Sequence, residues 1–115
     1  MDKFLKGFRY GFKGLAYAFK TQINFKVHTL SAILVILLGY FLEINTHEWL
    51  WILLAISMVL ISELFNTAME VLVDLVSPEY NQQAGIVKDV AAGAVLVTAL
   101  FAVAAGLIIF LPKIF

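Results

Sequence analysis

Hydrophobic positions along the chain gather into three long apolar stretches that two short polar segments separate. The stretches cover residues 27–43, about 49–76 and about 86–111. The second and third exceed the roughly 20 residues with which a helix crosses the hydrocarbon core of a bilayer. The first is marginal in length, but the helix before it can continue into it. The pattern predicts three transmembrane helices.

The first 26 residues alternate differently, between aromatic and basic side chains. Phe4, Phe8 and Phe12 recur at helical spacing. Basic residues follow a similar rhythm, at Lys3, Lys6, Arg9, Lys13 and Lys20. A helix with one cationic and one aromatic face is typical of the membrane interface. The expected fold is therefore an all-α membrane protein, a single domain over residues 1–115 in which an amphipathic surface helix (1–26) precedes three transmembrane helices.

Composition supports lipid as the natural surroundings of the chain. Its 115 residues are 63% hydrophobic and 14% charged, whereas soluble domains are about half apolar and a quarter charged. A soluble core of this size could not hide so much apolar surface. The formal net charge of zero gives no indication of nucleic-acid binding, and the absence of cysteine excludes disulfides and thiolate chemistry.

The distribution of basic residues predicts the orientation in the membrane. Six of the eight lysines and arginines precede the first apolar stretch, whereas the segment 43–48 has none. Lys88 follows the polar segment 77–85. The positive-inside rule then places the N-terminus and the 77–85 loop in the cytoplasm, and the 43–48 turn and the C-terminus outside.

Polar side chains interrupt the cytoplasmic half of the second apolar stretch. At about 100° per residue they fall within about 80° of one another on a helix. We call this set the acidic strip: Glu63, Asn66, Glu70 and Asp74. Glu63 lies about four turns inward from Pro78, where an unpartnered carboxylate costs a few kcal/mol and suggests a functional site. Lys88 and Asp89 are expected at the same depth.

Three kinds of chemistry fit the strip. Carboxylates with nearby lysines suit Mg²⁺ and a nucleotide, because Mg²⁺ takes one or two carboxylates together with phosphate oxygens. Paired acids also suit a proton or cation carrier. The third possibility is a non-catalytic assembly module. Ion pairs with Lys88 or Arg9 would then hold the helix bundle together, but such a pair explains one acidic residue and not three. Asp74 and Glu79 fit simple solvation at the helix end equally well. The residue types favour the nucleotide modestly, although no Walker A or kinase glycine-rich motif is present.

The stretch ELFNTAMEVLVDLVSPEYNQQAGIVKDVAAGAV, residues 63–95, resembles the signature of the prokaryotic diacylglycerol kinase family, which includes undecaprenol kinases. Weaker similarity extends to FKGLAYAFKTQINFKVH, residues 12–28. The resemblance implies a surface helix plus three transmembrane helices, assembled as a homotrimer with active sites shared between subunits. It also implies the bacterial cytoplasmic (inner) membrane as the location. The implied reaction transfers the γ-phosphoryl of MgATP to a lipid hydroxyl.

The resemblance also implies roles for individual residues. Glu63 matches the general base for the lipid hydroxyl, and Asn66 lies near the phosphates and the lipid. Glu70 matches a metal-binding carboxylate for Mg²⁺. Gln22 stands where the family usually has a second metal-binding glutamate, and an amide oxygen can bind a hard cation without adding charge.

The remaining matches concern ATP. Lys88 is implied to bind phosphate, Asp74 and Asp89 to belong to the nucleotide site, and two tyrosines to lie near the adenine. The expected ATP-binding set is Tyr10, Asn66, Asp74, Tyr80, Lys88 and Asp89. Lys3 replaces an arginine of some members. His28, at the start of the first apolar stretch, is interpreted as mainly structural, and His47 as solvated.

The substrate stays open at this point. The implied reaction converts diacylglycerol to phosphatidic acid, and the alternative is an undecaprenol kinase that makes undecaprenyl phosphate. The resemblance of the segment KDVAAGAV, residues 88–95, slightly favours an undecaprenol kinase. A small oligomeric proton or cation carrier is the alternative from another class.

Overall fold

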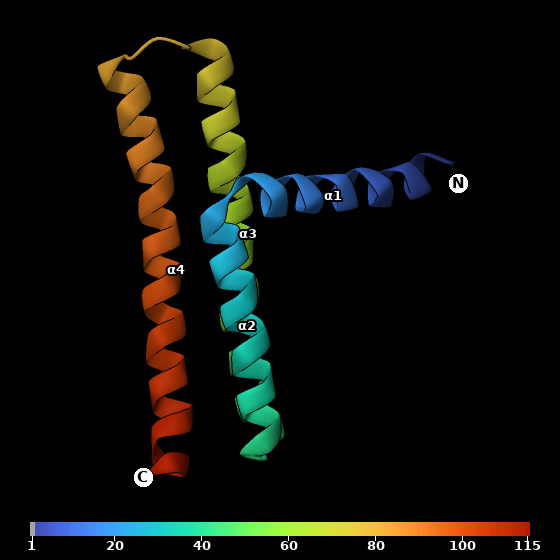
Figure 1. Cartoon of the computed structure of the whole chain (residues 1–115), viewed down its shortest axis with the longest axis vertical. Helices are drawn as coiled ribbons and strands as arrows, with labels where there is room; N and C mark the ends of the chain where they lie inside the picture. Colours follow the sequence, from blue (N-terminus) through green and yellow to red (C-terminus); the bar gives the residue numbers. More distant parts are fainter. Residues whose placement is uncertain (1) are drawn as a thin grey trace.

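The computed structural model describes residues 2–115, which form four helices (Figure 1). Their bounds are α1 Asp2–Thr21, α2 Ile23–Phe41, α3 Thr46–Val76 and α4 Gln82–Ile114. α3 and α4 lie side by side and antiparallel, α2 packs against α3, and α1 runs across this bundle rather than along it (Figure 1). By length and composition, α2, α3 and α4 can each cross a membrane. The predicted all-α class, with an N-terminal helix before three apolar helices, is confirmed.

The boundary between the first two helices differs from the sequence expectation. The surface helix ends at Thr21, and α2 begins at Ile23 rather than at residue 27. Gln22 separates the two helices, with an extended backbone at φ −112° and ψ 111°. Residues 23–26 therefore belong to the first apolar helix. No proline or glycine marks this bend, so the sequence pattern reads continuously through it.

α3 begins at Thr46, inside the segment expected to be a turn, because Asn45 caps it. Asn45 Oδ1 accepts a hydrogen bond from the Glu48 backbone N–H at 2.9 Å, and Glu48 Oε1 accepts one from the Asn45 N–H at 3.0 Å. This reciprocal capping box satisfies two N–H groups that a helix start leaves free. The predicted 43–48 turn is therefore shorter.

α4 also begins earlier than expected, at Gln82. Asn81 Oδ1 accepts hydrogen bonds from the N–H groups of Gln83 and Ala84, at 2.8 and 3.3 Å. This cap makes Gly85 helical, although the sequence pattern assigned it to a loop. The connection between α3 and α4 is consequently only residues 77–81.

The connection between α2 and α3 is a tight left-handed turn. Glu43 has φ 53° and is the one non-glycine residue with positive φ in the described chain. The Ile44 N–H donates to Gly39 O at 3.2 Å and the Glu43 N–H to Tyr40 O at 3.3 Å. These two bonds form a Schellman motif, in which the position of Glu43 usually carries glycine. This reversal of the chain buries Ile44, whose Cδ1 lies close to Gly39.

A cluster of buried apolar residues lies at the end of the bundle that holds this turn. Ile44 and Ile52 form an apolar cluster there with Ile109 and Phe110 of α4. Lys113 Nζ lies 3.2 Å from Glu48 Oε1 and ties the end of α4 to the start of α3. Many other large apolar side chains are exposed in the single chain, as expected where lipid or another subunit covers them.

Candidate active site

Glu63 lies where α1, α2 and α3 come together. Its exposed fraction is 1%, and it is the largest fully buried side chain in residues 2–115. Its Oε1 lies 3.5 Å from His28 Nε2 of α2. Its Oε2 is buried without a hydrogen-bond partner. A buried polar atom of this kind is uncommon and calls for an explanation.

One turn further along α3, Asn66 and Glu70 form the next part of the acidic strip. The Asn66 Nδ2 donates to Glu70 Oε1 at 3.4 Å, a long hydrogen bond. Asn66 is 7% exposed, and its Oδ1 also lacks a partner. Two unpaired acceptors, Glu63 Oε2 and Asn66 Oδ1, therefore lie on one face of the helix. Acceptors left free in this way are suited to a ligand that brings a hydroxyl or a cation.

The last acid of the strip is already paired within the chain. Lys88 Nζ of α4 donates to Asp74 Oδ1 at 2.7 Å, and both side chains are substantially exposed. Two residues expected in the nucleotide site are thus brought together. The structural interpretation of the strip as a set of ion pairs applies to Asp74, whereas Glu63 and Glu70 remain without a lysine or arginine partner in residues 2–115.

Four other expected site residues are not joined to the strip. No side-chain hydrogen bond or ion pair within the described residues connects it with Gln22, Asp89 or the two tyrosines. Tyr80 is 91% exposed on the 77–81 loop. Tyr10 is exposed on α1, with Lys13 Nζ 5.9 Å from its ring centre. Gln22 is half-buried at the α1–α2 bend.

The donor set near Glu70 restricts the kind of metal site. No group of three or more histidine, aspartate or glutamate side chains that could hold a metal occurs in residues 2–115. The Glu70 carboxylate and the free Asn66 Oδ1 are hard oxygen donors. Mg²⁺ that arrives on a nucleotide needs only one or two carboxylates from the protein. The residues present therefore fit a nucleotide-bound Mg²⁺ and not an independent all-protein metal cage.

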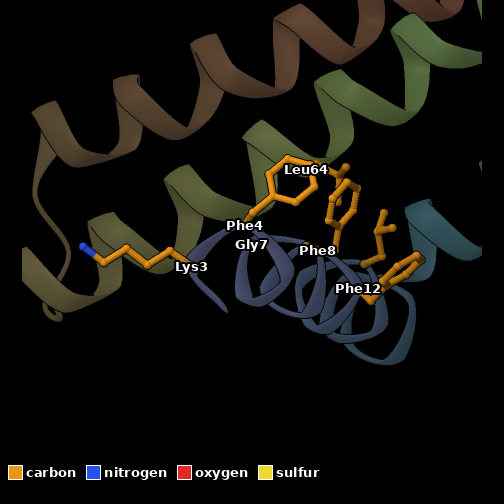
Figure 2. A pocket seen from close by; sticks show the side chains of 8 residues that line it. Lys3, Phe4, Gly7, Phe8, Phe12 and Leu64 are labelled. Carbon is orange, nitrogen blue, oxygen red and sulfur yellow. The ribbon is translucent and has the colours of Figure 1, made fainter. Parts of the chain in front are cut away.

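An open apolar groove lies along α1 and reaches α3 at a single residue. Its volume is about 700 Å³, and Leu64, the neighbour of Glu63, belongs to its wall. Figure 2 shows the rings of Phe4 and Phe8 between the two helices near Leu64, with Lys3 at one end of the groove. The two rings meet edge to face, with centres 5.1 Å apart. The groove offers apolar walls to a hydrocarbon chain.

The structure gives His28 a neighbour that the sequence did not indicate. His28 was interpreted as mainly structural, yet it is the side chain that faces Glu63. The available signal was its position at the start of an apolar helix, at the cytoplasmic depth of the strip. That position does not reveal which way the imidazole points, because the rotation of α2 against α3 depends on packing.

Comparisons with known proteins decide the family. The family model described as prokaryotic diacylglycerol kinase matches residues 9–110. The chain belongs to the prokaryotic diacylglycerol kinase family. An undecaprenol kinase of Bacillus subtilis is 38% identical over 99% of this chain and 93% of its own length. A diacylglycerol kinase of Synechocystis is 42% identical over 96% of this chain, which spans 63% of that relative. A diacylglycerol kinase of Escherichia coli is 27% identical over 88% of this chain and 83% of its own length.

Membership in the diacylglycerol kinase family makes the chain a lipid kinase and an integral membrane protein. The comparisons give no support to the carrier alternative. Such an enzyme needs a proton acceptor within reach of a hydroxyl that is attached to a hydrocarbon chain.

Proposed function

We propose that the chain transfers the γ-phosphoryl of MgATP to the hydroxyl of a membrane lipid, with diacylglycerol as the substrate and phosphatidic acid as the product. The observation that carries the proposal is the free, buried Oε2 of Glu63. The groove that Leu64, the next residue of α3, helps to line is the proposed entry for the lipid chains. A lipid whose chains occupy the groove would bring its headgroup to the Glu63 Oε2. Undecaprenol is the second candidate, because the undecaprenol kinase relative matches over 93% of its length.

Glu63 acts as general base in this proposal. Its carboxylate takes the hydroxyl proton while the lipid oxygen forms a bond to the γ-phosphorus and the bond from that phosphorus to the ADP oxygen breaks. Glu70 would hold Mg²⁺, with Gln22 as the expected second ligand, and the bound ion would neutralise charge on the phosphates. Lys88 meets the phosphates by exchanging its Asp74 partner for them. Positioning and electrostatics provide most of the rate in phosphoryl transfer of this kind.

Membrane geometry supports separate routes for the two substrates. α1 runs across the bundle, while α3 and α4 continue past it to the 77–81 loop (Figure 1). With α1 in the cytoplasmic interface, the groove receives lipid from the side. Asn66, Glu70 and Asp74 then stand on the water side, where ATP arrives. The proposed orientation has the N-terminus and this loop in the cytoplasm of a bacterial inner membrane and the C-terminus outside.

A homotrimer would complete the site. Tyr10, Tyr80 and Asp89 have no bond to the strip within the described chain, so another subunit is the proposed means of placing them around ATP. The many exposed apolar side chains leave ample surface for such an assembly.

The test is phosphorylation of lipid by the purified protein in mixed micelles, with radiolabelled ATP, Mg²⁺ and either diacylglycerol or undecaprenol. Glu63→Gln should lower turnover by about 10²–10⁴-fold, the contribution of a general base. Glu79→Gln, the same change on an exposed loop residue, is the matched control and should keep full turnover. Wild-type protein that labels neither lipid would refute the proposal, and an active Glu63→Gln variant would remove Glu63 from the base role.

A further inference from the structure

We infer that His28 is a positioning residue that orients the Glu63 carboxylate for proton abstraction. The inference rests on the proposed function and goes beyond the residues that the sequence signature contains. Its starting point is the contact between His28 Nε2 and Glu63 Oε1, at 3.5 Å across α2 and α3.

The surroundings of Glu63 leave His28 as its one basic neighbour. Within residues 2–115, the ion pairs are His28 with Glu63, Lys88 with Asp74, and Lys113 with Glu48. Lys88 is thus engaged elsewhere. Thr67 Oγ1 donates to the backbone oxygen of Glu63, at 2.9 Å, and not to its carboxylate. A glutamate side chain with three rotatable bonds needs a fixed partner to present one oxygen in one place, and His28 is placed to be that partner.

The two oxygens of Glu63 are consequently different. Oε1 faces the imidazole, whereas Oε2 is buried with no partner. The imidazole Nε2 can present an N–H to a carboxylate both as the neutral tautomer and as the cation. An N–H directed at Oε1 would leave Oε2 as the acceptor for the lipid hydroxyl. Enzymes that activate a hydroxyl group commonly use one residue to orient the general base, and the base then acts on the nucleophile.

The position of His28 in its helix makes this role mechanically plausible. The side chain is 26% exposed, whereas that of Glu63 is 2% exposed, so the imidazole covers the carboxylate from the α2 side. Phe25, one turn earlier on α2, is buried and anchors the same part of the helix. The imidazole also contributes to a cavity wall with Ser31 and Val35 that extends along α2. The contact with Glu63 and the burial of Phe25 are the observations that fix this part of α2 against α3.

The experiment compares His28→Phe with His28→Gln in the lipid kinase assay. Phenylalanine keeps a ring but has no N–H, whereas the glutamine amide can place an N–H near the position of Nε2. His28→Phe should lower kcat by about 10- to 100-fold, within the total that a general base supplies, with an unchanged KM for ATP. His28→Gln should recover most of kcat. His47→Phe, at the exposed start of α3, controls for the loss of a histidine and should leave kcat unchanged.

Each outcome decides between the inference and its alternatives. Equal loss in His28→Phe and His28→Gln would overturn positioning by an N–H, and so would full activity in His28→Phe. A rise in the KM for ATP with constant kcat would assign His28 to nucleotide binding and also overturn it. Wild-type enzyme without lipid kinase activity would refute the proposed function instead. Circular dichroism and gel filtration of both variants check that any loss is not a failure to fold.

Discussion

Asp74 Oδ1 and Lys88 Nζ lie 2.7 Å apart, so the last acid of the strip on α3 is held by a lysine near the start of α4. Both belong to the expected nucleotide site. The pair also bridges the two helices on either side of the 77–81 loop. Its exposure makes it available for exchange with a phosphate, since an exposed ion pair contributes only about 0–1 kcal/mol to stability.

Replacing Lys88 by glutamine should therefore affect ATP far more than folding. Loss of one charge-assisted hydrogen bond, about 1.5–3 kcal/mol, should raise the KM for ATP by about tenfold or more. The melting temperature in detergent micelles should change little. Steady-state kinetics at varied ATP, beside thermal unfolding, measure the two effects. The double variant with Asp74→Asn reports their coupling: strictly additive effects on KM would contradict an exchange of partners.

Gln22→Glu should tighten the apparent affinity for Mg²⁺ several-fold. The added carboxylate would supply a second charged oxygen ligand at the α1–α2 bend, and Mg²⁺ binds commonly through one or two carboxylates. Titration of activity with free Mg²⁺ at constant MgATP measures the change. Gln83→Glu, exposed near the start of α4, is the control for added charge. Equal responses of the two variants would place Gln22 away from the metal.

Glu43→Gly should stabilise the fold by about 1 kcal/mol. Glu43 adopts φ 53°, a conformation that costs an L-residue about 1–2 kcal/mol and costs glycine little. Part of that gain is lost to the greater freedom of glycine in the unfolded chain. Unfolding in detergent micelles, followed by circular dichroism, measures the difference. Glu43→Ala retains the strain and should bring no gain; an equal gain from both substitutions would show that the side chain, not the backbone, is responsible.

Gly39→Ala should destabilise the same turn by about 1–3 kcal/mol, the usual cost of overpacking. A Cβ at residue 39 would lie 2.9 Å from Trp49 Cη2 and 3.0 Å from Ile44 Cδ1. Gly14→Ala on α1 is the matched control, because apart from the adjoining backbone of α1 no atom lies within 4 Å of a Cβ built there. The control should unfold at the same temperature or slightly higher, as alanine favours helix. An unchanged unfolding temperature for Gly39→Ala would contradict the prediction and would mean that Trp49 moves aside at little cost.

The sequence predicted the architecture because hydropathy and helical spacing are local properties. Three apolar runs and one basic aromatic run gave four helices in the right order, and angular spacing placed Glu63, Asn66 and Glu70 on one face of α3. The predicted positions of the helix ends were less accurate. They depend on single hydrogen bonds, such as the Asn45 and Asn81 caps, that a hydropathy pattern does not register.

Contacts between helices were the harder part to predict. The bend at Gln22 has no proline or glycine to mark it, and the facing of His28 and Glu63 depends on how α2 is rotated against α3. Rotation about a helix axis is set by the fit of side chains along the whole interface. Lys88 and Asp74 were easier, because the short polar loop expected at 77–85, and found at 77–81, joins the two apolar helices and brings their ends to the same depth.

The placement of α1 across the bundle has a consequence for kinetics. If lipid enters through the groove at Leu64 as proposed, it arrives by two-dimensional diffusion. The enzyme should then respond to the mole fraction of substrate in the bilayer and not to its bulk concentration. Dilution of the substrate with inert lipid should slow the reaction at constant total substrate. Adding more vesicles of unchanged composition should leave the turnover of each enzyme molecule the same.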